Sequence, residues 1–391
     1  MVKKLQPKLR FRGFTDAWEQ RRLGSLFVQA NERNANQELS FGTTISVASM
    51  RFNPRGNGAA HSSLSSYKIL RRGDIAFEGN RHRSHPFGQL VINDIGDGLM
   101  SSRFQSIRPK EPCVISFWKY LLQNERGMRR LLICSTKAGT LMNEFVFGDF
   151  SRLDVQLPER DEQEKIGALF RLLDSIIAAE KRKLDLLKKK KTTLLLQVFD
   201  QKLRFKRYNT PWKQRHLGVL LEETNEVASD REILSVTVSN GIYPARDGAK
   251  DSNPGESIYK YKVVHINDIV YNSMRLWQGA IGISGYEGIV SPAYTVCHVR
   301  EVVDARFCAY LLRSYPALRE FYRYSQGNSK DTLILKYPEF SQIIVTIPPS
   351  FSEQEDIANT LDCLNQLIAA ETRKIDMLRL KKKALLQQMF I

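Results

Sequence analysis

Residue types that usually form catalytic sites are sparse in this sequence. His82 and His85 are spaced like two metal ligands, but the neighbouring Arg81 and Arg83 would repel a cation. A metal-dependent nuclease needs an acidic residue ahead of an Asp-x-Lys triplet, and the triplet at 200–202 is better explained as a helix terminus. No Gly is followed directly by Lys, which excludes a Walker A phosphate loop. We therefore expect neither catalytic residues nor a metal in this chain.

Two polar loops carry the side-chain types that read DNA bases. One loop follows a predicted strand ending at Phe77, and the other follows a predicted strand ending at Tyr271. Arg can bond guanine O6 and N7, whereas Asn and Gln can bond adenine N6 and N7. The candidate DNA-binding residues in these and similar polar loops are Arg81, His82, Arg83, Arg103, Asn272, Arg275, Trp277, Gln278 and Lys330. For each residue, a solvent-facing position or a phosphate contact is the open alternative.

The charge balance indicates a polyanionic partner. The 391 residues carry a formal net charge of +17 with a pI near 9.6, and nucleic acid is the usual partner of so basic a chain. A membrane is disfavoured because neither a signal peptide nor an uncharged apolar run of spanning length is visible. The five scattered cysteines indicate neither a disulfide framework nor a zinc site. We expect a cytoplasmic protein.

A long helical pattern occurs twice and must position the two loops. Residues Gln163–Phe199 align without a gap with Gln354–Phe390, 191 positions later, and 18 of the 37 aligned residues are identical. Neither stretch contains Pro, and both are rich in strong helix formers. We predict two helices, each about 55 Å long at 1.5 Å per residue.

Apolar residues recur along both predicted helices in steps of four and three, which is coiled-coil spacing. This seam comprises Ile166, Phe170, Leu173, Ile177, Leu184, Leu187, Leu194 and Val198, matched by Ile357, Leu361, Leu364, Ile368, Ile375, Leu378, Leu385 and Met389. The alternative for such a stripe is a core helix of an ordinary domain.

Four charged residues interrupt the seam. In an antiparallel pair, one register joins Glu180 to Lys382 and also joins Lys191 to Glu371. Polar seam residues often fix register, so this is the register that the sequence predicts. In the alternative, both lysines extend into solvent and the glutamates contact a partner protein.

A short lead-in and a globular block precede each helix. Leu9–Gly24 recurs as Leu203–Gly218, 194 positions later, whereas the blocks match only at scattered points. Each block is predicted to be mixed α/β. The predicted strands are Thr44–Ala48, Asp74–Phe77, Gln89–Ile92, Phe104–Ile107, Leu234–Val238, Asp268–Tyr271, Ile281–Ser284 and Tyr294–Val299, and the predicted helices are Ile115–Gln123 and Ala305–Arg313.

This arrangement resembles the specificity subunit of type I restriction–modification enzymes. Two divergent blocks are each followed by a helix that opens near Glu-Gln-Glu and contains Ile-Ala-Ala-Glu. The short elements agree as well: Trp18 and Leu23-Gly24, Trp212 and Leu217-Gly218, Gly73-Asp74-Ile75, Asn267-Asp268-Ile269, the WQGA of 277–280 and the SPAY of 291–294. The resemblance covers essentially the whole chain. The first block departs from the family's commoner pattern, with Arg-His-Arg-Ser-His where the second has Met-Arg-Leu-Trp-Gln.

The resemblance implies an α/β protein with two pseudo-symmetric target-recognition domains joined by two long antiparallel coiled-coil helices. The expected boundaries are residues 1–158 for the first domain, 159–200 for the central helix, 201–349 for the second domain and 350–391 for the C-terminal helix. Each domain would read half of a bipartite double-stranded DNA target.

The resemblance also implies that the chain has no catalysis and no cofactor of its own. Two methyltransferase subunits would dock on the helices, and motor-nuclease subunits would join for cleavage. S-adenosylmethionine, ATP and magnesium would belong to those subunits. The expected partner-binding residues are Ile166, Leu173, Ile177, Glu180, Leu187, Lys191, Ile357, Leu364, Ile368, Glu371, Leu378 and Lys382.

Two other classes of protein are the rivals of this interpretation. A self-sufficient nuclease or methyltransferase would need the catalytic motifs that the sequence lacks. A DNA-bridging protein without base specificity would give a uniform footprint on DNA, whereas a specificity subunit would give two defined half-sites.

Overall fold

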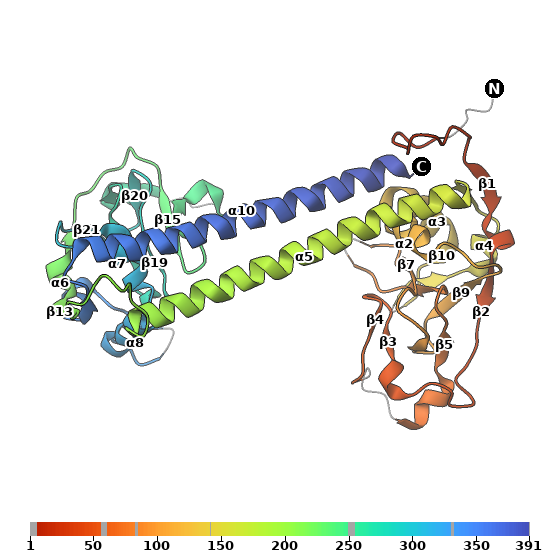
Figure 1. The fold of residues 1–391 in the computed structure, drawn as a ribbon, viewed down its shortest axis with the longest axis horizontal. Helices are drawn as coiled ribbons and strands as arrows, with labels where there is room; N and C mark the ends of the chain where they lie inside the picture. Colours follow the sequence, from red (N-terminus) through yellow and green to blue (C-terminus); the bar gives the residue numbers. More distant parts are fainter. Residues whose placement is uncertain are drawn as a thin grey trace. The chain divides into compact units, whose positions relative to one another are not determined.

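The structure is a computed structural model that describes residues 6–55, 61–82, 85–140, 142–248, 255–329 and 332–390. The chain divides into two compact units (Figure 1). The first unit comprises Met1–Lys181 and Arg373–Ile391, and the second comprises Arg182–Thr372. Each unit therefore contains one globular block and a part of both long helices.

A four-stranded antiparallel sheet forms the centre of the first block, in the order β2-β9-β6-β7. Its strands are β2 (Phe27–Ala30), β9 (Gln105–Pro109), β6 (Ile75–Glu78) and β7 (Gln89–Ile92). All four residues of β6 are buried, because Ile75 and Phe77 pack into one apolar cluster and Ala76 into another. A strand covered on both faces does not show an alternating pattern of polar residues.

The second block repeats this sheet in the order β14-β21-β18-β19. Its strands are β14 (Leu221–Thr224), β21 (Tyr294–Val299), β18 (Ile269–Asn272) and β19 (Ile281–Ile283). Strand β18 is also covered on both faces, with Tyr271 in one cluster and Val270 in another. The duplication seen in the sequence is therefore a duplication of the fold.

Smaller elements complete each block. In the first block they are β1 (Glu19–Arg22), α1 (Leu23–Leu26), η1 (Phe41–Thr43), β3 (Ile45–Ser46), β4 (Arg51–Phe52), η2 (His61–Ser66), β5 (Lys68–Leu70), β8 (Gly98–Met100), α2 (Ile115–Gln123), α3 (Glu125–Ser135), β10 (Thr136–Lys137), β11 (Glu144–Phe145), α4 (Phe147–Ser151) and β12 (Asp154–Leu157). In the second block they are β13 (Lys213–His216), α6 (Leu217–Leu220), β15 (Leu234–Thr237), β16 (Gly241–Pro244), η3 (Ala245–Asp247), η4 (Gly255–Lys260), β17 (Lys262–Val264), η5 (Leu276–Gln278), β20 (Gly288–Val290), α7 (Ala305–Leu312), α8 (Tyr315–Tyr324), α9 (Tyr337–Ser341) and β22 (Ile344–Ile347).

The mixed α/β class predicted from the sequence is confirmed. Each of the eight predicted strands has a counterpart, although the one expected at Thr44–Ala48 shortens to the two residues of β3. Both predicted helices are present, as α2 and α7. The sequence analysis missed α3 and α8, which follow those two helices directly and bear on the candidate site described below.

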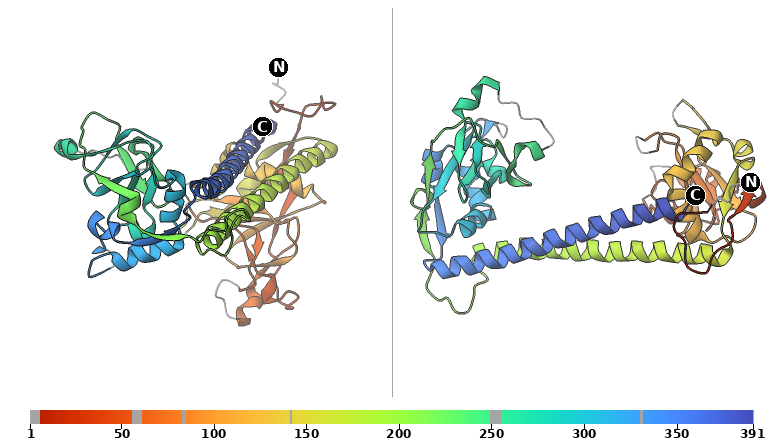
Figure 2. Two further views of the ribbon diagram at one scale, coloured as in Figure 1. Left: turned by 60° about the vertical axis from the view of Figure 1, so that its left-hand side comes forward. Right: turned by 90° about the horizontal axis from the view of Figure 1, so that it is seen from above.

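The two long helices are α5 (Arg160–Phe199) and α10 (Phe351–Met389). Each unit contains a part of α5 and a part of α10, and these two parts lie side by side and antiparallel (Figures 1 and 2). The predicted seam faces inward, since Ile166, Phe170 and Ile177 are buried in the first unit and Leu184 and Ile357 in the second. The predicted antiparallel pairing is therefore confirmed, and at the helix ends the seam also packs into the cores of the blocks.

The register predicted from the sequence is wrong. Glu180 Oε1 contacts Lys374 Nζ at 2.5 Å rather than Lys382, and Glu371 Oε2 contacts Lys183 Nζ at 2.8 Å rather than Lys191. Each partner is eight residues from the expected one, about 12 Å along a helix. Both predicted Glu–Lys pairs are therefore wrong, and the two seam glutamates contact Lys374 and Lys183 instead, which are not seam residues.

The physical reason is a carboxylate outside the seam. Lys382 Nζ lies 2.7 Å from Asp174 Oδ1 and 5.0 Å from the centre of the Tyr120 ring. The repeat places Asn365 where the first helix has Asp174, so Lys191 lacks the equivalent carboxylate. Burial, and then the charge of Arg313, lower the pKa of Lys191.

The repeated lead-ins anchor each block to the helix pair through a buried ion pair. Arg10 binds Glu162 through Nε and Nη2 at 2.7 and 2.8 Å, and Arg204 binds Glu353 with both contacts at 2.7 Å. Both glutamates are almost fully buried, so their charge needs the bidentate guanidinium. This contact explains why the lead-in and the helix start are repeated together.

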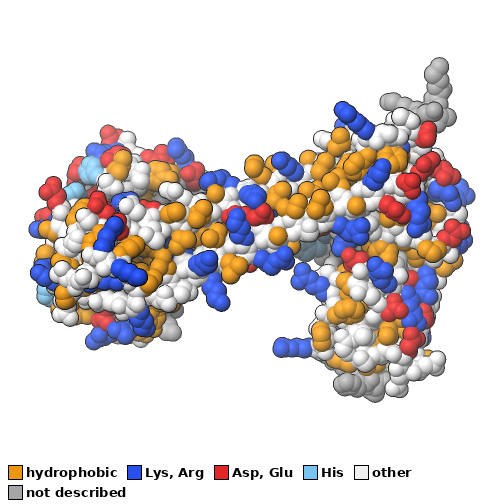
Figure 3. Space-filling view, viewed as in Figure 1, with side chains coloured by type: hydrophobic (Ala, Val, Ile, Leu, Met, Phe, Trp, Pro, Cys, Tyr) orange, Lys and Arg blue, Asp and Glu red, His pale blue; other side chains and the backbone are white. Residues whose placement is uncertain are grey.

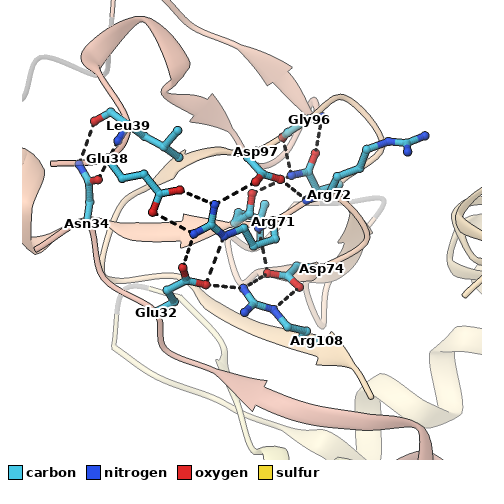
Figure 4. A network of polar contacts seen from close by, with 12 residues as sticks. Glu32, Asn34, Glu38, Leu39, Arg71, Arg72, Asp74, Gly96, Asp97 and Arg108 are labelled. Carbon is cyan, nitrogen blue, oxygen red and sulfur yellow. Dashed lines mark hydrogen bonds and ion pairs between the residues drawn. The ribbon is translucent and has the colours of Figure 1, made fainter. Parts of the chain in front are cut away.

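A second charged network braces the first block (Figure 4). Arg71 contacts Glu32, Glu38 and Asp97 at 2.5, 2.7 and 3.0 Å, at the turn between β5 and β6. The hydrogen bond from Arg71 lowers the pKa of Glu32. The network fixes the start of β6, whose far end leads into the first polar loop.

Candidate nucleic-acid interface

The first polar loop leaves β6 and is held against the segment that follows α3. Asn143 is buried, its backbone N–H donates to Gly79 O at 2.8 Å, and its side-chain amide donates to Pro86 O at 2.9 Å. Arg81 donates to Gly139 O at 2.7 Å and to Asn143 Oδ1 at 3.3 Å. Arg81 therefore has a defined place in the loop, with its guanidinium committed in part to the chain's own carbonyls.

The other candidates lie elsewhere in the blocks. The backbones of His82 and His85 pair with each other, with His85 N–H donating to His82 O at 2.9 Å. Arg103 is exposed, and its guanidinium carbon lies 4.8 Å from the centre of the Phe104 ring. Arg83 and Lys330 lie outside the described residues.

The second polar loop leaves β18 and turns through η5. Asn272 Oδ1 accepts the backbone N–H of Met274 at 3.0 Å, so this amide shapes the loop. Leu276 is fully buried and anchors η5, while Arg275 and Gln278 are exposed on either side of it. Gly279 ends the turn with φ of +91°, a conformation that favours glycine. The loop thus presents one guanidinium and one amide from a rigid base.

Trp277 connects the second loop to α8. Its ring packs edge-to-face on Tyr322, with 5.8 Å between ring centres. Trp277 is half-buried, and its indole N–H is buried without a hydrogen-bond partner in the described part of the chain. We interpret Trp277 as a residue that positions the loop on α8.

A groove of about 660 Å³ lies beside the first loop. His85 and Gln89 line one side, and Gln123 of α2 and Arg129 of α3 line another. The first loop and α3 therefore belong to one continuous surface. The sequence analysis did not find this surface, because α3 was not predicted.

Comparison with protein families identifies the first block. Residues 15–189 match the family model of the type I restriction modification DNA specificity domain. The first block and most of the helix after it are therefore similar to such a specificity domain. The second unit repeats its sheet order and its lead-in, so both blocks share the specificity-domain fold. No curated protein sequence matches the chain.

Solved structures extend the likeness to the whole chain. The type I restriction–modification S subunit from M. genitalium has a TM-score of 0.57 at 12% identity, with 99% of each chain covered. The HsdS subunit from Thermoanaerobacter tengcongensis has a TM-score of 0.51 at 17% identity, with 96% of this chain and 97% of that one covered. A third structure, from work on complex assembly and conformational transition of the type I R-M system, has a TM-score of 0.54 at 17% identity. The match covers 96% of this chain and 98% of that one. At these identities the likeness shows a shared fold.

The helix residues that the sequence suggested for partner binding are mostly used within the chain. Four of the twelve are buried, namely Ile166, Ile177, Ile357 and Glu371. The other eight are half-buried, namely Leu173, Glu180, Leu187, Lys191, Leu364, Ile368, Leu378 and Lys382. Their role toward a partner stays a prediction.

A different set of apolar side chains is exposed on the helices, and the sequence analysis passed over it. In the first unit, Leu172 of α5 and Met377 and Leu380 of α10 are 58%, 58% and 68% exposed. In the second unit, Leu186 of α5 and Leu367 of α10 are 58% and 49% exposed. Figure 3 shows hydrophobic side chains along the exposed side of α10. These exposed apolar positions are candidates for a docking surface.

Three further observations concern metal sites, membrane-spanning helices and cysteines. Within the described ranges, no three His, Cys, Asp or Glu side chains come together as a metal site. None of the described helices is long and apolar enough to cross a membrane. All five cysteines are free, and burial raises the pKa of the Cys308 thiol to about 12.

Proposed function

We propose that this chain is the DNA-recognition subunit of a type I restriction–modification complex and that each domain reads one half of a bipartite double-stranded target. The observation that carries the proposal is the duplication. The block that matches the DNA specificity domain is followed by a second block of the same fold, with an equivalent polar loop. The domains are residues 1–158 and 201–349, and the helices at 159–200 and 350–391 set the spacing of the half-sites.

Base reading in the second half-site falls to Arg275 and Gln278. Both side chains are exposed on a loop whose backbone is fixed by Asn272, Leu276 and Gly279. In the first half-site, Arg81 holds the loop in place, and His82, Arg83 and Arg103 are the candidates for base or phosphate contact. Positioning and reading are thus divided between different side chains in each loop.

Catalysis belongs to partner subunits in this proposal. Two methyltransferase subunits dock on α5 and α10, and motor-nuclease subunits join for cleavage. S-adenosylmethionine, ATP and magnesium are bound by those subunits. The free cysteines fit a reducing cytoplasm, where the DNA target lies.

Amphipathic helices of the methyltransferase are the proposed occupants of the exposed apolar positions on α5 and α10. Replacing Met377 and Leu380 with Ser removes apolar area at two residues that are more than half exposed. We expect the double variant to lose methyltransferase in co-purification. The matched control is Lys383→Ser, which shortens an exposed charged side chain of the same helix and leaves the exposed apolar residues in place. Equal recovery of methyltransferase by both variants would refute this docking surface.

The function itself is tested by sequencing methylated adenines in the genome with and without the gene. The proposal predicts one bipartite methylated motif that disappears when the gene is deleted. An unchanged methylation pattern, together with a uniform footprint of the purified complex, would favour a DNA-bridging protein without base specificity. Methyltransferase or nuclease activity of the purified chain alone would also contradict the proposal.

A further inference from the structure

Helix α3 presents three arginines on its exposed side. Arg126, Arg129 and Arg130 are exposed, whereas Met128 and Leu132 on the opposite side are buried in the core of the first domain. The spacing of three and four residues places the three guanidinium groups on one face. The apolar residues fix the helix, so the arginines are held at a defined place on the surface.

These arginines form no ion pair in the described part of the chain, although Glu125 lies four residues before Arg129. None of the three guanidinium groups lies within ion-pair distance of a carboxylate there, and Glu125 in the first turn of α3 makes no such contact. Like charges at this spacing destabilise a helix. The cluster therefore costs stability, and no ion pair within the described residues offsets that cost.

The equivalent helix of the second domain is built differently. On α8, Arg319 and Arg323 both contact Glu320, at 3.5 and 2.8 Å. The exposed residues beside them include Tyr315 and Tyr322, which are 66% and 47% exposed. Uncompensated positive charge is therefore a property of α3 and not of the duplicated fold.

The location of α3 connects this charge to the first recognition loop. Arg129 lines the same groove as His85 of the loop and Gln89 at the start of β7. Arg81 of the loop donates to Gly139, four residues after the end of α3. DNA whose bases meet the loop would therefore bring its phosphates near α3.

We propose that the exposed face of α3 binds phosphates of the DNA backbone beside the half-site read by the first domain, and that α8 makes no equivalent contribution. This inference rests on the proposed function. Arginine suits the role because its planar guanidinium can bond phosphate oxygens in pairs and keeps its charge. Phosphate contacts position a protein on DNA without reading sequence. The first domain then supplies more of the salt-dependent affinity than the second.

The test uses the complete complex with its methyltransferase subunits and a duplex carrying the methylated motif. The affinity is measured at several salt concentrations for the wild type, for Arg126→Gln/Arg129→Gln/Arg130→Gln, and for the control Arg319→Gln/Arg323→Gln. Each phosphate contact contributes about 0.9 to the slope of log K against log salt, so loss of three contacts makes the slope shallower by about 2–3. We expect the control to change the slope by less than about 1 and the methylated motif to stay the same in both.

A second variant separates charge from structure. Arg126→Lys/Arg129→Lys/Arg130→Lys keeps the positive charge and is expected to keep most of the slope. An unchanged slope in the Gln variant, or an equal loss in the Lys variant, would overturn the inference and leave the proposed function intact. Loss of the methyltransferase from the Gln variant would also overturn it, because α3 would then bind an acidic protein surface. Absence of any bipartite motif in the wild type would instead refute the proposed function.

Discussion

The two globular blocks place a carboxylate at the same turn but surround it with different basic side chains. Asp74 in the first domain and Asp268 in the second each accept the backbone N–H of the residue three positions earlier, at 2.9 and 2.8 Å. The cation facing Asp74 is Arg108, with two contacts at 2.8 Å. The residue facing Asp268 is His298, whose Nδ1 lies 3.2 Å away.

The neighbouring position shows the same exchange of arginine for histidine. Arg71 contacts three carboxylates in the first domain (Figure 4). His265 occupies the equivalent place in the second domain, with Glu226 and Glu287 at 3.3 and 3.0 Å from its ring nitrogens. Arg231 lies 3.8 and 3.7 Å from the same two carboxylates. Both domains place a basic side chain among the carboxylates at this turn. In the first domain it is the guanidinium of Arg71, and in the second it is the imidazole of His265, together with Arg231.

The difference matters because a guanidinium stays protonated at all relevant pH values, whereas an imidazole does not. The hydrogen bond that His265 donates to Glu226, and then the one to Glu287, raise the pKa of His265. A raised pKa in the folded state stabilises the domain below the unfolded pKa near 6.5, and this stability is lost as pH rises through the folded pKa. In the first domain, the hydrogen bond from Arg71 lowers the pKa of Glu32. The stability that Glu32 contributes is therefore lost only as pH falls into the acid range.

The largest expected effect comes from removing the charge at the shared turn. Asp74→Asn takes the paired carboxylate from Arg108, and we expect a loss of about 1.5–3 kcal/mol of local stability, as for hydrogen bonds to charged groups. Asp268→Asn takes a single contact from the exposed ring of His298, and we expect a smaller loss of about 0.5–1.5 kcal/mol. Hydrogen–deuterium exchange of the β5–β6 and β17–β18 peptides measures both. Equal losses of stability in the two variants would show that the arginine and the histidine stabilise the turn equally.

The repeat, the seam and the mixed α/β blocks could be predicted because they depend on local periodicity and on self-similarity of the sequence. The register could not, because it depends on Asp174 and Tyr120, which approach Lys382 only in the folded chain. Helix α3 was missed for a different reason. It has eleven residues, includes Gly127, and has no side-chain cap, so its sequence carries a weak helical signal.

The two units also differ in how their helix ends are packed. In the first unit, Phe170 is fully buried and stacks on Phe390, with 5.9 Å between ring centres. The repeat places the smaller Leu361 at the position of Phe170 in the second unit, where it lines an apolar cavity of about 260 Å³ together with Val198.

Filling this cavity is the second way to sharpen the comparison. We expect Leu361→Phe to raise the stability of the second unit by about 0.5–2 kcal/mol, the usual gain from cavity filling. Denaturant unfolding of the full chain, followed by exchange protection of the α10 peptides, measures the change. Thr360→Ser, at another lining position, is the control and should add nothing. A destabilised Leu361→Phe variant would mean that the two helix ends are not equivalent.

The smallest expected effect concerns pH. His265→Arg should make the second domain more stable at pH 8 by about 0.2–1 kcal/mol, the range for partly exposed ion pairs, and should change little at pH 5.5. The reciprocal variant Arg71→His should bring the same alkaline loss to the first domain. Local exchange rates at both pH values provide the measurement. An equal effect of His265→Arg at the two pH values would show that the histidine acts through packing rather than charge.

The central claim is that the two domains read separate halves of one DNA target. Its most direct test replaces residues 25–158 with the corresponding block of a related chain and sequences the methylated adenine motif of cells that carry the chimera. The account predicts that one half of the motif changes while the other half keeps its sequence. A motif altered in both halves, or in neither, would contradict the claim that each domain recognises its half-site independently.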